Sequence, residues 1–339
     1  MLKEVIRKTT ERVNLSSAEM EAAMEEIMEG RATSAQIGSL LTALKMKGET
    51  VEEITGAARM VRTKAVQVSV ADDGTPLVDT CGTGGDSAGT FNISTTVAFI
   101  VAGGGARVAK HGNRSVSSSC GSADVLMELG APLDLPPDAV GKCIEQTGFG
   151  FLFAPTFHVA MKHAANPRRE MGIRTMFNVL GPLTNPASAT CQLLGVYDPN
   201  LTEPIARALQ GLGTHSAMVA HGLDGLDEIS LCAPTKVSRL HDKTVTTFQL
   251  DPRDFGMTLC SREQISGGSA AENARHLMDV LEGKPGPRRD ISLLNAAAAF
   301  VAAEFAENIK EGLRLAERSV SSGNARDKLN EFLGFGKSS

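Results

Sequence analysis

Short apolar stripes and helix-start signals alternate along the first 65 residues. Capping-box spacings begin at Ser16, Thr33 and Thr50, and apolar residues follow each of them at helical spacing. Gly30 and Gly48 lie where the first two helices are expected to end. Methionines on the first stripe are more typical of a core or a subunit interface than of a ligand groove. The pattern predicts three amphipathic helices in a small N-terminal domain.

After residue 73 the pattern changes to alternating short strands and helices. The predicted strands are 76–79, 106–109, 191–196 and 217–220, and the predicted helices are 94–102, 123–129, 164–180 and 202–212. From residue 270 the chain reads as helical, with a Gly/Pro-rich break at 283–287. Alternating strands and helices predict a sheet with parallel strands, which binds its ligands beyond the carboxyl ends of the strands.

The composition adds limits on location and partners. Of 339 residues, 42% are hydrophobic and 22% are charged, and the net charge is −5. These values are typical of a soluble globular protein and argue against a nucleic acid or an anionic membrane as a partner. The N-terminus has no signal-peptide core, and no apolar run approaches the roughly 18 residues of a membrane span. The six cysteines are scattered without a C-x-x-C pair, so a reducing, cytoplasmic location is expected.

The stretch DTCGTGGDSAGTFNIST, residues 79–95, joins a predicted strand to a predicted helix. It lacks the Gly-Lys-Ser/Thr of a Walker A loop, and Ser87 stands where a Rossmann fingerprint needs its third glycine. A tight turn alone would explain one or two of the glycines, but not Asp86 or the polar residues at the helix start. A glycine-rich turn before a helix exposes backbone N–H groups and a positive dipole end, so the stretch is predicted to bind phosphate.

A second polar stretch, KHGNRSVSS at residues 110–118, follows the predicted strand 106–109. It is expected to form a loop at the same end of the sheet, with Lys110 and Arg114 as cations. Runs of charge usually form a solvated face. Here the cations alternate with glycine, asparagine and serine, which suits a polyanion bound by side chains and backbone N–H groups together.

Three carboxylates lie in HGLDGLDE, residues 221–228, after the predicted strand 217–220. Mg²⁺ typically takes one or two protein carboxylates together with water and substrate phosphates, so this turn suits a magnesium site. A solvated acidic turn is the alternative that the pattern leaves open. The tandem Arg168 and Arg169 in the predicted helix 164–180 are, on composition alone, more typical of a surface.

Five motifs together resemble the anthranilate phosphoribosyltransferase family, in order along nearly the whole chain. They are GTGGD at 82–86, NIST at 92–95, KHGNRSVSS at 110–118, GIRTMFNVLGPLTNP at 172–186 and DGLDE at 224–228. The resemblance implies an α/β fold class, with a small all-helical N-terminal domain plus a larger α/β domain whose mixed, largely parallel central sheet is flanked by helices. It places the helical domain at 1–70 with a returning helical segment at about 164–183, and the α/β domain at 71–163 and 184–339.

The resemblance also implies a Mg²⁺-dependent pentosyl transfer. Phosphoribosyl pyrophosphate (PRPP) gives its phosphoribosyl group to the amine of anthranilate, which yields N-(5-phosphoribosyl)anthranilate and pyrophosphate in tryptophan biosynthesis. Pyrophosphate departs through an oxocarbenium-like transition state, so metal ions and cations are expected to carry the catalysis. No covalent nucleophile is implied, and Lys110 is assigned an electrostatic role.

The site residues that the resemblance implies fall into three groups. Contacts to PRPP are assigned to Gly82, Gly85, Asp86, Thr90, Asn92, Ile93, Ser94, Thr95, Lys110, His111, Gly112, Asn113, Arg114, Ser115, Val116, Ser117, Ser118 and Ser122. Contacts to anthranilate are assigned to Gly82, Asn113, His158 and Arg168. Two Mg²⁺ ions per active site are expected, held by Ser94, Asp227 and Glu228.

The expected partners are the two small-molecule substrates and a second copy of the chain, in a homodimer through the helical domain. Two other classes of protein stay open. A nucleoside phosphorylase of the same fold would carry a KHSTGG-like loop, where this chain has CGTGG at 81–85. A non-catalytic relative that binds nucleic acid would be basic and would have lost the metal carboxylates, whereas this chain is acidic and retains Asp227 and Glu228.

Overall fold

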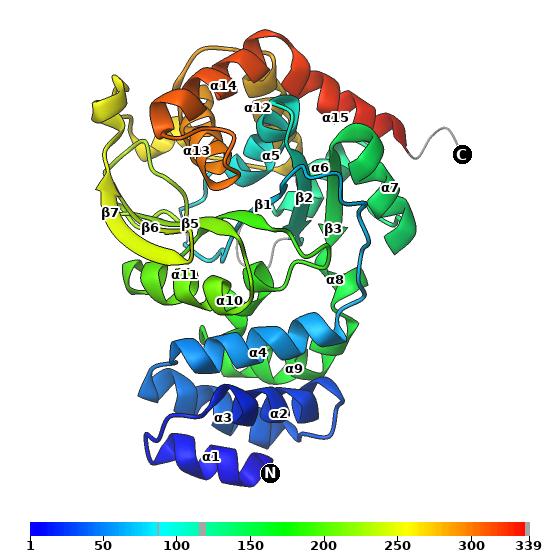
Figure 1. Cartoon of the computed structure of the whole chain (residues 1–339), viewed down its shortest axis with the longest axis vertical. Coiled ribbons are helices and arrows are strands. Elements are labelled where there is room, and N and C mark those ends of the chain that lie inside the picture. Colours follow the sequence, from blue (N-terminus) through cyan, green and yellow to red (C-terminus); the bar gives the residue numbers. More distant parts are fainter. Residues whose placement is uncertain (87, 115–119, 336–339) are drawn as a thin grey trace.

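The computed structural model describes residues 1–86, 88–114 and 120–335. Its N-terminal part is a stack of helices, α1 (Leu2–Thr10), α2 (Ser17–Met28), α3 (Ser34–Lys47) and α4 (Val51–Lys64), at the bottom of Figure 1. All three predicted capping boxes form, so α2, α3 and α4 begin directly after Ser16, Thr33 and Thr50. The sequence predicted only these three helices, and α1 is the one it missed.

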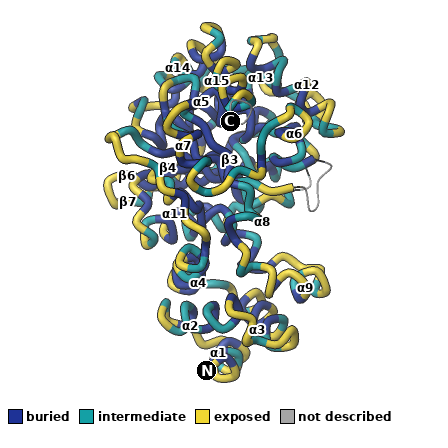
Figure 2. The backbone as a smooth tube through the Cα atoms, turned by 90° about the vertical axis from the view of Figure 1, so that its right-hand side faces the viewer, coloured by how far each residue is buried: buried dark blue, intermediate teal, exposed yellow. Residues whose placement is uncertain are grey.

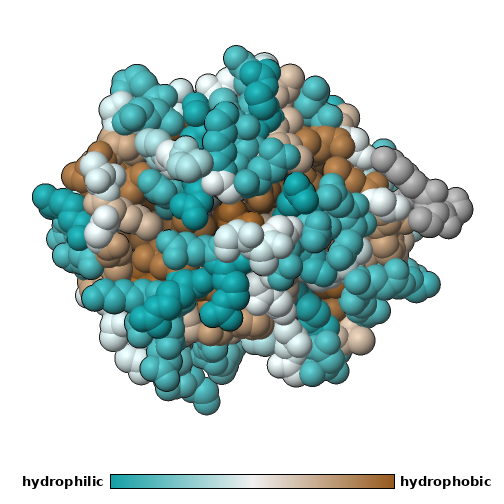
Figure 3. Space-filling view, turned by 90° about the horizontal axis from the view of Figure 1, so that it is seen from above, coloured by the Kyte–Doolittle hydropathy of each residue, from teal (hydrophilic) through white to brown (hydrophobic). Residues whose placement is uncertain are grey.

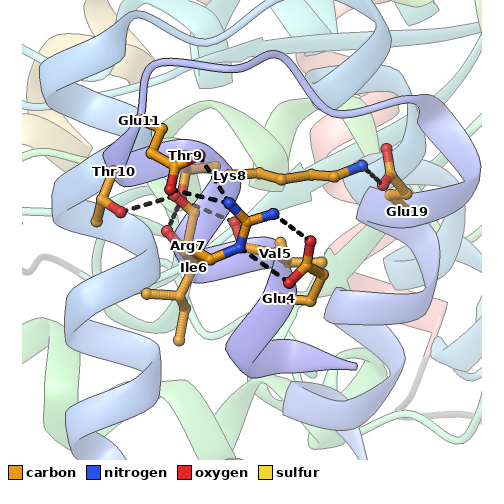
Figure 4. A network of polar contacts seen from close by, with 9 residues as sticks. All are labelled: Glu4, Val5, Ile6, Arg7, Lys8, Thr9, Thr10, Glu11 and Glu19. Atoms are coloured by element: carbon orange, nitrogen blue, oxygen red, sulfur yellow. Dashed lines mark hydrogen bonds and ion pairs between the residues drawn. The ribbon is translucent and has the colours of Figure 1, made fainter.

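The additional helix α1 docks on the domain through a small apolar side that includes Leu2 and Val5. Its exposed side carries the ion pairs in Figure 4, which join Arg7 to Glu4 and Glu11 and join Lys8 to Glu19 of α2. Solvent screens exposed ion pairs such as these, so they stabilise little, and the buried side chains do more to position α1. The dense charges around these few apolar residues obscured the helix in the sequence pattern.

The larger part of the chain is built on one seven-stranded sheet. Its strands are β1 (Leu77–Gly82), β2 (Arg107–Gly112), β3 (Phe149–Phe153), β4 (Cys191–Gly195), β5 (Ser216–Gly222), β6 (Thr235–His241) and β7 (Thr244–Leu250), in the order β3-β2-β1-β4-β5-β6-β7. Pairing is parallel from β3 through β5 and antiparallel from β5 to β7. The predicted fold class, with its mixed and largely parallel sheet, is therefore confirmed.

Helices cover both faces of this sheet. The helices of this part of the chain are α5 (Ile93–Gly103), α6 (Ser122–Glu128), α7 (Pro137–Thr147), α8 (Ala154–Phe157), α9 (Lys162–Met171), α10 (Phe177–Leu180), α11 (Thr202–Gly211), α12 (Ala270–Leu281), α13 (Pro287–Ala302), α14 (Ile309–Ser321) and α15 (Asn324–Phe335). Of these, α9 packs on α2 and α3 of the helical domain. One apolar cluster joins the sheet to α5 and the C-terminal helices, and a second runs from the opposite face through α10 and α11 into the helical domain. In Figure 2 the buried residues accordingly concentrate around the sheet.

Three local expectations differ from the structure. The predicted helix 164–180 is two helices, because Gly172 has a φ of 61° that ends α9 before α10 begins. The strand predicted at 106–109 continues to Gly112, so Lys110 and His111 lie within β2 and not in a loop. The β6–β7 hairpin was not predicted, and most residues of β7 are exposed or half-buried, which hides the alternation that identifies a strand.

The strand order reverses at the centre of the sheet. The chain leaves β1 toward β2 and β3 on one side and returns to β4 on the other side, so β1 and β4 flank the point where the order reverses. Ligands of such sheets bind beyond the carboxyl ends of the strands at this point. In Figure 1, α8, which directly follows β3, lies between the sheet and the helical domain, so these carboxyl ends face that domain.

The outer surface carries hydrophilic residues over most of the face in Figure 3, with hydrophobic ones visible in the gaps between them. No helix among the described residues combines the length and the apolar composition that a membrane crossing requires.

Candidate active site

Glycines end four of the parallel strands, and the loops beyond them approach closely because these positions have no Cβ. A Cβ on Gly82 would lie 2.7 Å from Oδ2 of Asp227, and one on Gly195 would lie 1.5 Å from the carbonyl oxygen of Asp227. On the neighbouring strand, a Cβ on Gly112 would lie 2.2 Å from Oγ of Ser122. The glycines therefore bring the acidic turn against the ends of β1 and β4, and Ser122 against the end of β2.

The glycine loop after β1 is tied to both of its neighbours. The N–H of Thr83 donates to the carbonyl of Gly195 at 2.9 Å, and the N–H of Gly84 donates to Oδ2 of Asp227 at 2.8 Å. Gly84 and Gly85 have φ angles of 66° and 76°, a region that side chains with a Cβ rarely adopt. Glycine is needed here for backbone conformation as well as for close approach.

The carboxylate of Asp86, at the end of the glycine loop, lies close to carboxylates of the acidic turn 224–228. Oδ2 of Asp86 accepts a 3.4 Å hydrogen bond from the N–H of Asp227. Burial, and then the charge of Asp86, raise the pKa of Asp227, and burial followed by the charge of Asp227 raises the pKa of Glu228 well above its usual value. These groups repel one another, so a cation placed among them would be bound favourably. Asp224 is not part of this group, since its Oδ2 accepts a 3.0 Å hydrogen bond from Oγ of Ser230.

Lys110 is buried next to these acids. Its Nζ donates to the carbonyl of Thr80 at 2.5 Å and to Oγ of Ser94 at 3.3 Å. Burial lowers the pKa of Lys110, and the charges of Asp79 and Glu228 act in the opposite direction. The lysine therefore connects the base of the glycine loop, the start of α5 and the acidic turn.

The N-terminus of α5 points into the same region. Asn92, its N-cap residue, uses its side chain elsewhere: Nδ2 donates to the carbonyl of Cys120 and Oδ1 accepts from Asn273. The side chains of Ile93 and Thr95 are buried, so a ligand at this end would meet the backbone N–H groups of the first turn. Thr90 lies just before this turn, in a bridge with Ser266.

The second polar stretch is described only in part, because Ser115, Val116, Ser117 and Ser118 lie outside the described residues. The carbonyl of Asn113 accepts a 3.2 Å hydrogen bond from Oγ of Ser122, so these two predicted residues are brought together. The side chain of Arg114 instead lies over Phe153, with its Cζ 5.9 Å from the centroid of that ring.

Two histidines that were predicted as site residues lie together in a separate, buried part of the site. The rings of His111 and His158 lie 5.0 Å apart at 64°. Burial lowers the pKa of His111 to about 3 and that of His158 to about 4, so both rings are neutral at pH 7. Among the described residues, Nε2 of His111 and both ring nitrogens of His158 are buried without a hydrogen-bond partner.

Arg168 and Arg169, adjacent on α9, have different surroundings. The Cζ of Arg168 lies 5.1 Å from the centroid of the Phe177 ring, and burial lowers the pKa of this arginine. Arg168 makes no ion pair with any residue that the structure describes. Arg169 is exposed and bonds Oδ1 of Asn166 at 2.9 Å. Within the part of the chain that the structure describes, no side-chain hydrogen bond or ion pair joins Arg168 to the glycine loop or the acidic turn.

Sequence reasoning missed two groups that the fold brings to the site. Asp79 is fully buried and accepts hydrogen bonds from the N–H of His111 at 3.1 Å and from Nδ2 of Asn185 at 2.8 Å, which holds β1, β2 and the 181–186 segment together. Arg174 lies against Gly85. Both belong to motifs noted in the sequence, but only the tertiary contacts distinguish them from their neighbours.

The donor atoms present fit Mg²⁺, a hard cation that prefers oxygen ligands. Carboxylate oxygens come from Asp86, Asp227 and Glu228, and a hydroxyl comes from Ser94. Within the described ranges, no three side chains of His, Cys, Asp or Glu are placed to enclose an ion by themselves. Such an open arrangement suits a metal that keeps water and phosphate oxygens among its ligands.

One class of glycosyl transferase has this arrangement. In it a helical bundle is followed by an α/β domain, and a glycine-rich loop lies where the strand order of the sheet reverses. The sequence model described as "Glycosyl transferase family, helical bundle domain" matches residues 3–65, and the one described as "Glycosyl transferase family, a/b domain" matches residues 74–326.

Comparison with relatives of similar length identifies the family within this class of glycosyl transferases. The chain is 55% identical over 335 residues to an anthranilate phosphoribosyltransferase from Symbiobacterium thermophilum, covering 98% of this chain and 97% of that one. Among solved structures, the enzyme of that name from Thermus thermophilus superposes with a TM-score of 0.93 at 40% identity, covering 98% and 99% of the two chains. The Saccharomyces cerevisiae enzyme, in complex with PRPP and Mg, gives 0.90 at 31% identity, covering 100% and 98%. The chain belongs to the anthranilate phosphoribosyltransferase family.

Proposed function

We propose that this chain transfers the phosphoribosyl group of PRPP to the amine of anthranilate, as a Mg²⁺-dependent pentosyltransferase of tryptophan biosynthesis. The observation that carries the proposal is the meeting of Asp86, Asp227 and Glu228 beside a glycine loop and a helix N-terminus. The relatives' names, and the yeast structures with PRPP and Mg and with 4-fluoroanthranilate, support the same substrates.

The donor is assigned to the reversal point of the sheet. Backbone N–H groups of the glycine loop and of the first turn of α5 would face its phosphates, together with Asn113 and Ser122 at the end of β2. Lys110 is held near this position by Thr80 and Ser94, so it is assigned the electrostatic role. The assignments of Ser115 to Ser118 and of the remaining donor residues stay predictions.

Magnesium is assigned to Ser94, Asp227 and Glu228, and the structure adds Asp86 as a candidate. When bound, the metal would neutralise charge that develops on the departing pyrophosphate. Because these carboxylates repel one another, a bound cation would stabilise them in their charged form. Two ions per site is our proposal, since several carboxylates and the donor's phosphates offer more oxygen ligands than one ion needs.

The acceptor is assigned to the region of His158 and Arg168. The neutral histidine rings offer a dry surface for an aromatic ring, and an arginine without an ion-pair partner among the described residues offers two parallel hydrogen bonds to a carboxylate. Asn113 and Gly82 are assigned to the boundary between the two substrates.

The chemical step needs little from the protein beyond position and charge. The bond between C1 of the ribose and the pyrophosphate oxygen breaks, the amine nitrogen bonds to C1, and a proton leaves the nitrogen. An aromatic amine is unprotonated at neutral pH, so a strong general base is not required. Closure of the helical domain over the sheet edge would keep water from the activated donor.

The quaternary and domain assignments belong to the same proposal. We expect a cytoplasmic homodimer formed through the helical domain. The domain boundaries at 70–71, 163–164 and 183–184 are also proposed, and they agree with the packing of α9 on α2 and α3.

Product analysis tests this function. The purified chain is incubated with PRPP, Mg²⁺ and anthranilate, and the products are separated and identified by mass. Formation of phosphoribosyl-anthranilate with one equivalent of pyrophosphate is the expected result. Conversion of a nucleoside and phosphate instead would assign the chain to the phosphorylases of this fold, and tight binding of nucleic acid without turnover would assign it to the non-catalytic relatives.

A further inference from the structure

Arg174 lies in the segment between α9 and α10, which connects the returning helix to the sheet. The segment begins at Gly172, whose φ of 61° turns the chain out of α9. Its direction places the Arg174 side chain against the glycine loop, although 89 positions separate Arg174 from Gly85.

The guanidinium of Arg174 lies beside the space that a side chain on Gly85 would occupy. A Cβ on Gly85 would lie 3.3 Å from Nη2, 3.4 Å from Nε and 3.5 Å from Cζ of Arg174. The Nε–Cζ–Nη2 part of the guanidinium thus borders the space that a side chain on Gly85 would fill. Gly85 has a φ of 76°, so the loop holds an unusual backbone conformation at the point of contact.

Tyr197, in the loop after β4, lies against the same guanidinium. The Cζ of Arg174 is 4.7 Å from the centroid of the tyrosine ring, within the range of a cation–π contact. The backbone N–H of Tyr197 donates to Oγ1 of Thr83 at 3.1 Å, so the tyrosine is itself tied to the glycine loop. The three segments therefore form one contact unit at the reversal point of the sheet.

No carboxylate of the described residues lies within ion-pair distance of Arg174, so an ion pair does not explain its position there. Among the described residues Arg174 forms no ion pair, and it lines a cavity of about 580 Å³ together with Tyr197, Asp198 and Lys45 of α3. A long cation that is not neutralised is expected to extend into solvent unless its flat face is held. Here the tyrosine ring holds it.

We infer that Arg174 is a positioning residue for the donor loop: stacked on Tyr197, it supports Gly85 in the conformation that receives the phosphates of PRPP. The inference rests on the proposed function for the identity of the donor. It assigns no contact between Arg174 and the substrate, because the arginine acts through the backbone of Gly85.

Binding of PRPP with Mg²⁺, measured by calorimetry, tests this assignment without requiring turnover. Arg174→Ala and Tyr197→Leu should each raise the dissociation constant about three- to tenfold, and the double variant should do no worse than the stronger single change. Tyr197→Phe keeps the ring and should stay within twofold of the wild type. Hydrogen exchange of the peptide 82–86 should speed up in the two defective variants only.

Three results would overturn the inference. Unchanged PRPP binding in Arg174→Ala would show that Arg174 does not position the glycine loop for the donor. A defect in Arg174→Ala with wild-type binding in Tyr197→Leu would mean that the guanidinium acts without the stack. Equal weakening of PRPP and anthranilate binding, with a lowered melting temperature, would mark a general structural role. If the wild type binds PRPP but forms no phosphoribosyl-anthranilate, the proposed function fails while this comparison still stands.

Discussion

The backbone N–H of Gly84 donates a hydrogen bond of 2.8 Å to Oδ2 of Asp227, across 143 positions of sequence. The bond joins the loop assigned to phosphate with the turn assigned to magnesium. A change at either end is therefore expected to affect the binding of both the metal and the donor.

Asp227→Asn and Glu228→Gln should lower turnover and weaken Mg²⁺ activation, roughly 10- to 100-fold, because each removes a charge from the metal site. Neither change opens a cavity, so the fold should stay intact by circular dichroism. Asp224→Asn is the matched control in the same turn, since that carboxylate binds Ser230 and not the metal group. Normal turnover at every Mg²⁺ concentration in both variants would mean that the turn is only a solvated acidic loop.

Gly85→Ala should weaken PRPP binding in calorimetry. The new Cβ meets the guanidinium of Arg174 and must adopt a φ near 76°, which costs about 1 kcal/mol or more and displaces the loop. Gly256→Ala is the control, because Gly256 has a φ of 74° with nothing within 4 Å of an added Cβ. If both variants bind PRPP like the wild type, GTGGD is a structural turn.

Arg168→Ala should raise the KM for anthranilate about ten- to a hundredfold and leave the KM for PRPP nearly unchanged. The lost charged hydrogen bonds are worth about 1.5–3 kcal/mol. Arg168→Lys should recover only part, because an ammonium cannot make the planar two-point contact. Steady-state kinetics with each substrate varied in turn measures the effect.

Arg169→Ala is the internal control for that experiment, since Arg169 is exposed and bonded to Asn166. An anthranilate defect in Arg169→Ala alone would move the acceptor site to that residue. If neither variant shows a defect, both arginines are surface residues and the acceptor assignment is wrong.

Stability should fall as the pH drops below about 6.5, partly because of His111 and His158. Their pKa values are about 3 and 4 in the folded chain, depressed by burial, whereas the unfolded chain protonates both near 6.5. The unfolded state therefore binds more protons between these values, and each ring lowers the free energy of unfolding by about 1.4 kcal/mol per pH unit there.

His158→Phe removes one of these rings and should reduce the loss of stability between pH 6 and pH 5 by about 1.2 kcal/mol. Urea unfolding at the two pH values measures it, with His163→Gln, on the exposed side of α9, as the control for loss of an imidazole. The same pH dependence in His158→Phe and wild type would show that His158 titrates normally.

Much of the fold could be predicted because its signals are local. Capping boxes at Ser16, Thr33 and Thr50 fix helix starts within a few residues, and the alternation of strands with helices gives a parallel sheet. The start of α9 at Lys162 and the exposed strand β7 were harder to predict from the sequence, because tertiary packing and not local pattern defines them.

The site shows the same division. Motifs located the glycine loop and the acidic turn, but no local pattern says that Asp86 meets Asp227 while Asp224 turns away to Ser230. Likewise, nothing in the sequence around Arg174 predicts that its side chain lies beside Gly85.

The proposed Mg²⁺-dependent formation of phosphoribosyl-anthranilate consumes anthranilate, which is fluorescent, so the reaction can be followed by loss of that fluorescence. The fluorescence of anthranilate is followed in the presence of PRPP, first with chelator and then with Mg²⁺ added back, for the wild type and for Asp227→Asn. We predict a steady loss of signal only when PRPP and Mg²⁺ are both present, and a much slower loss in the variant. A wild-type signal that stays constant under all of these conditions, from a folded protein, would mean that the chain does not catalyse this transfer.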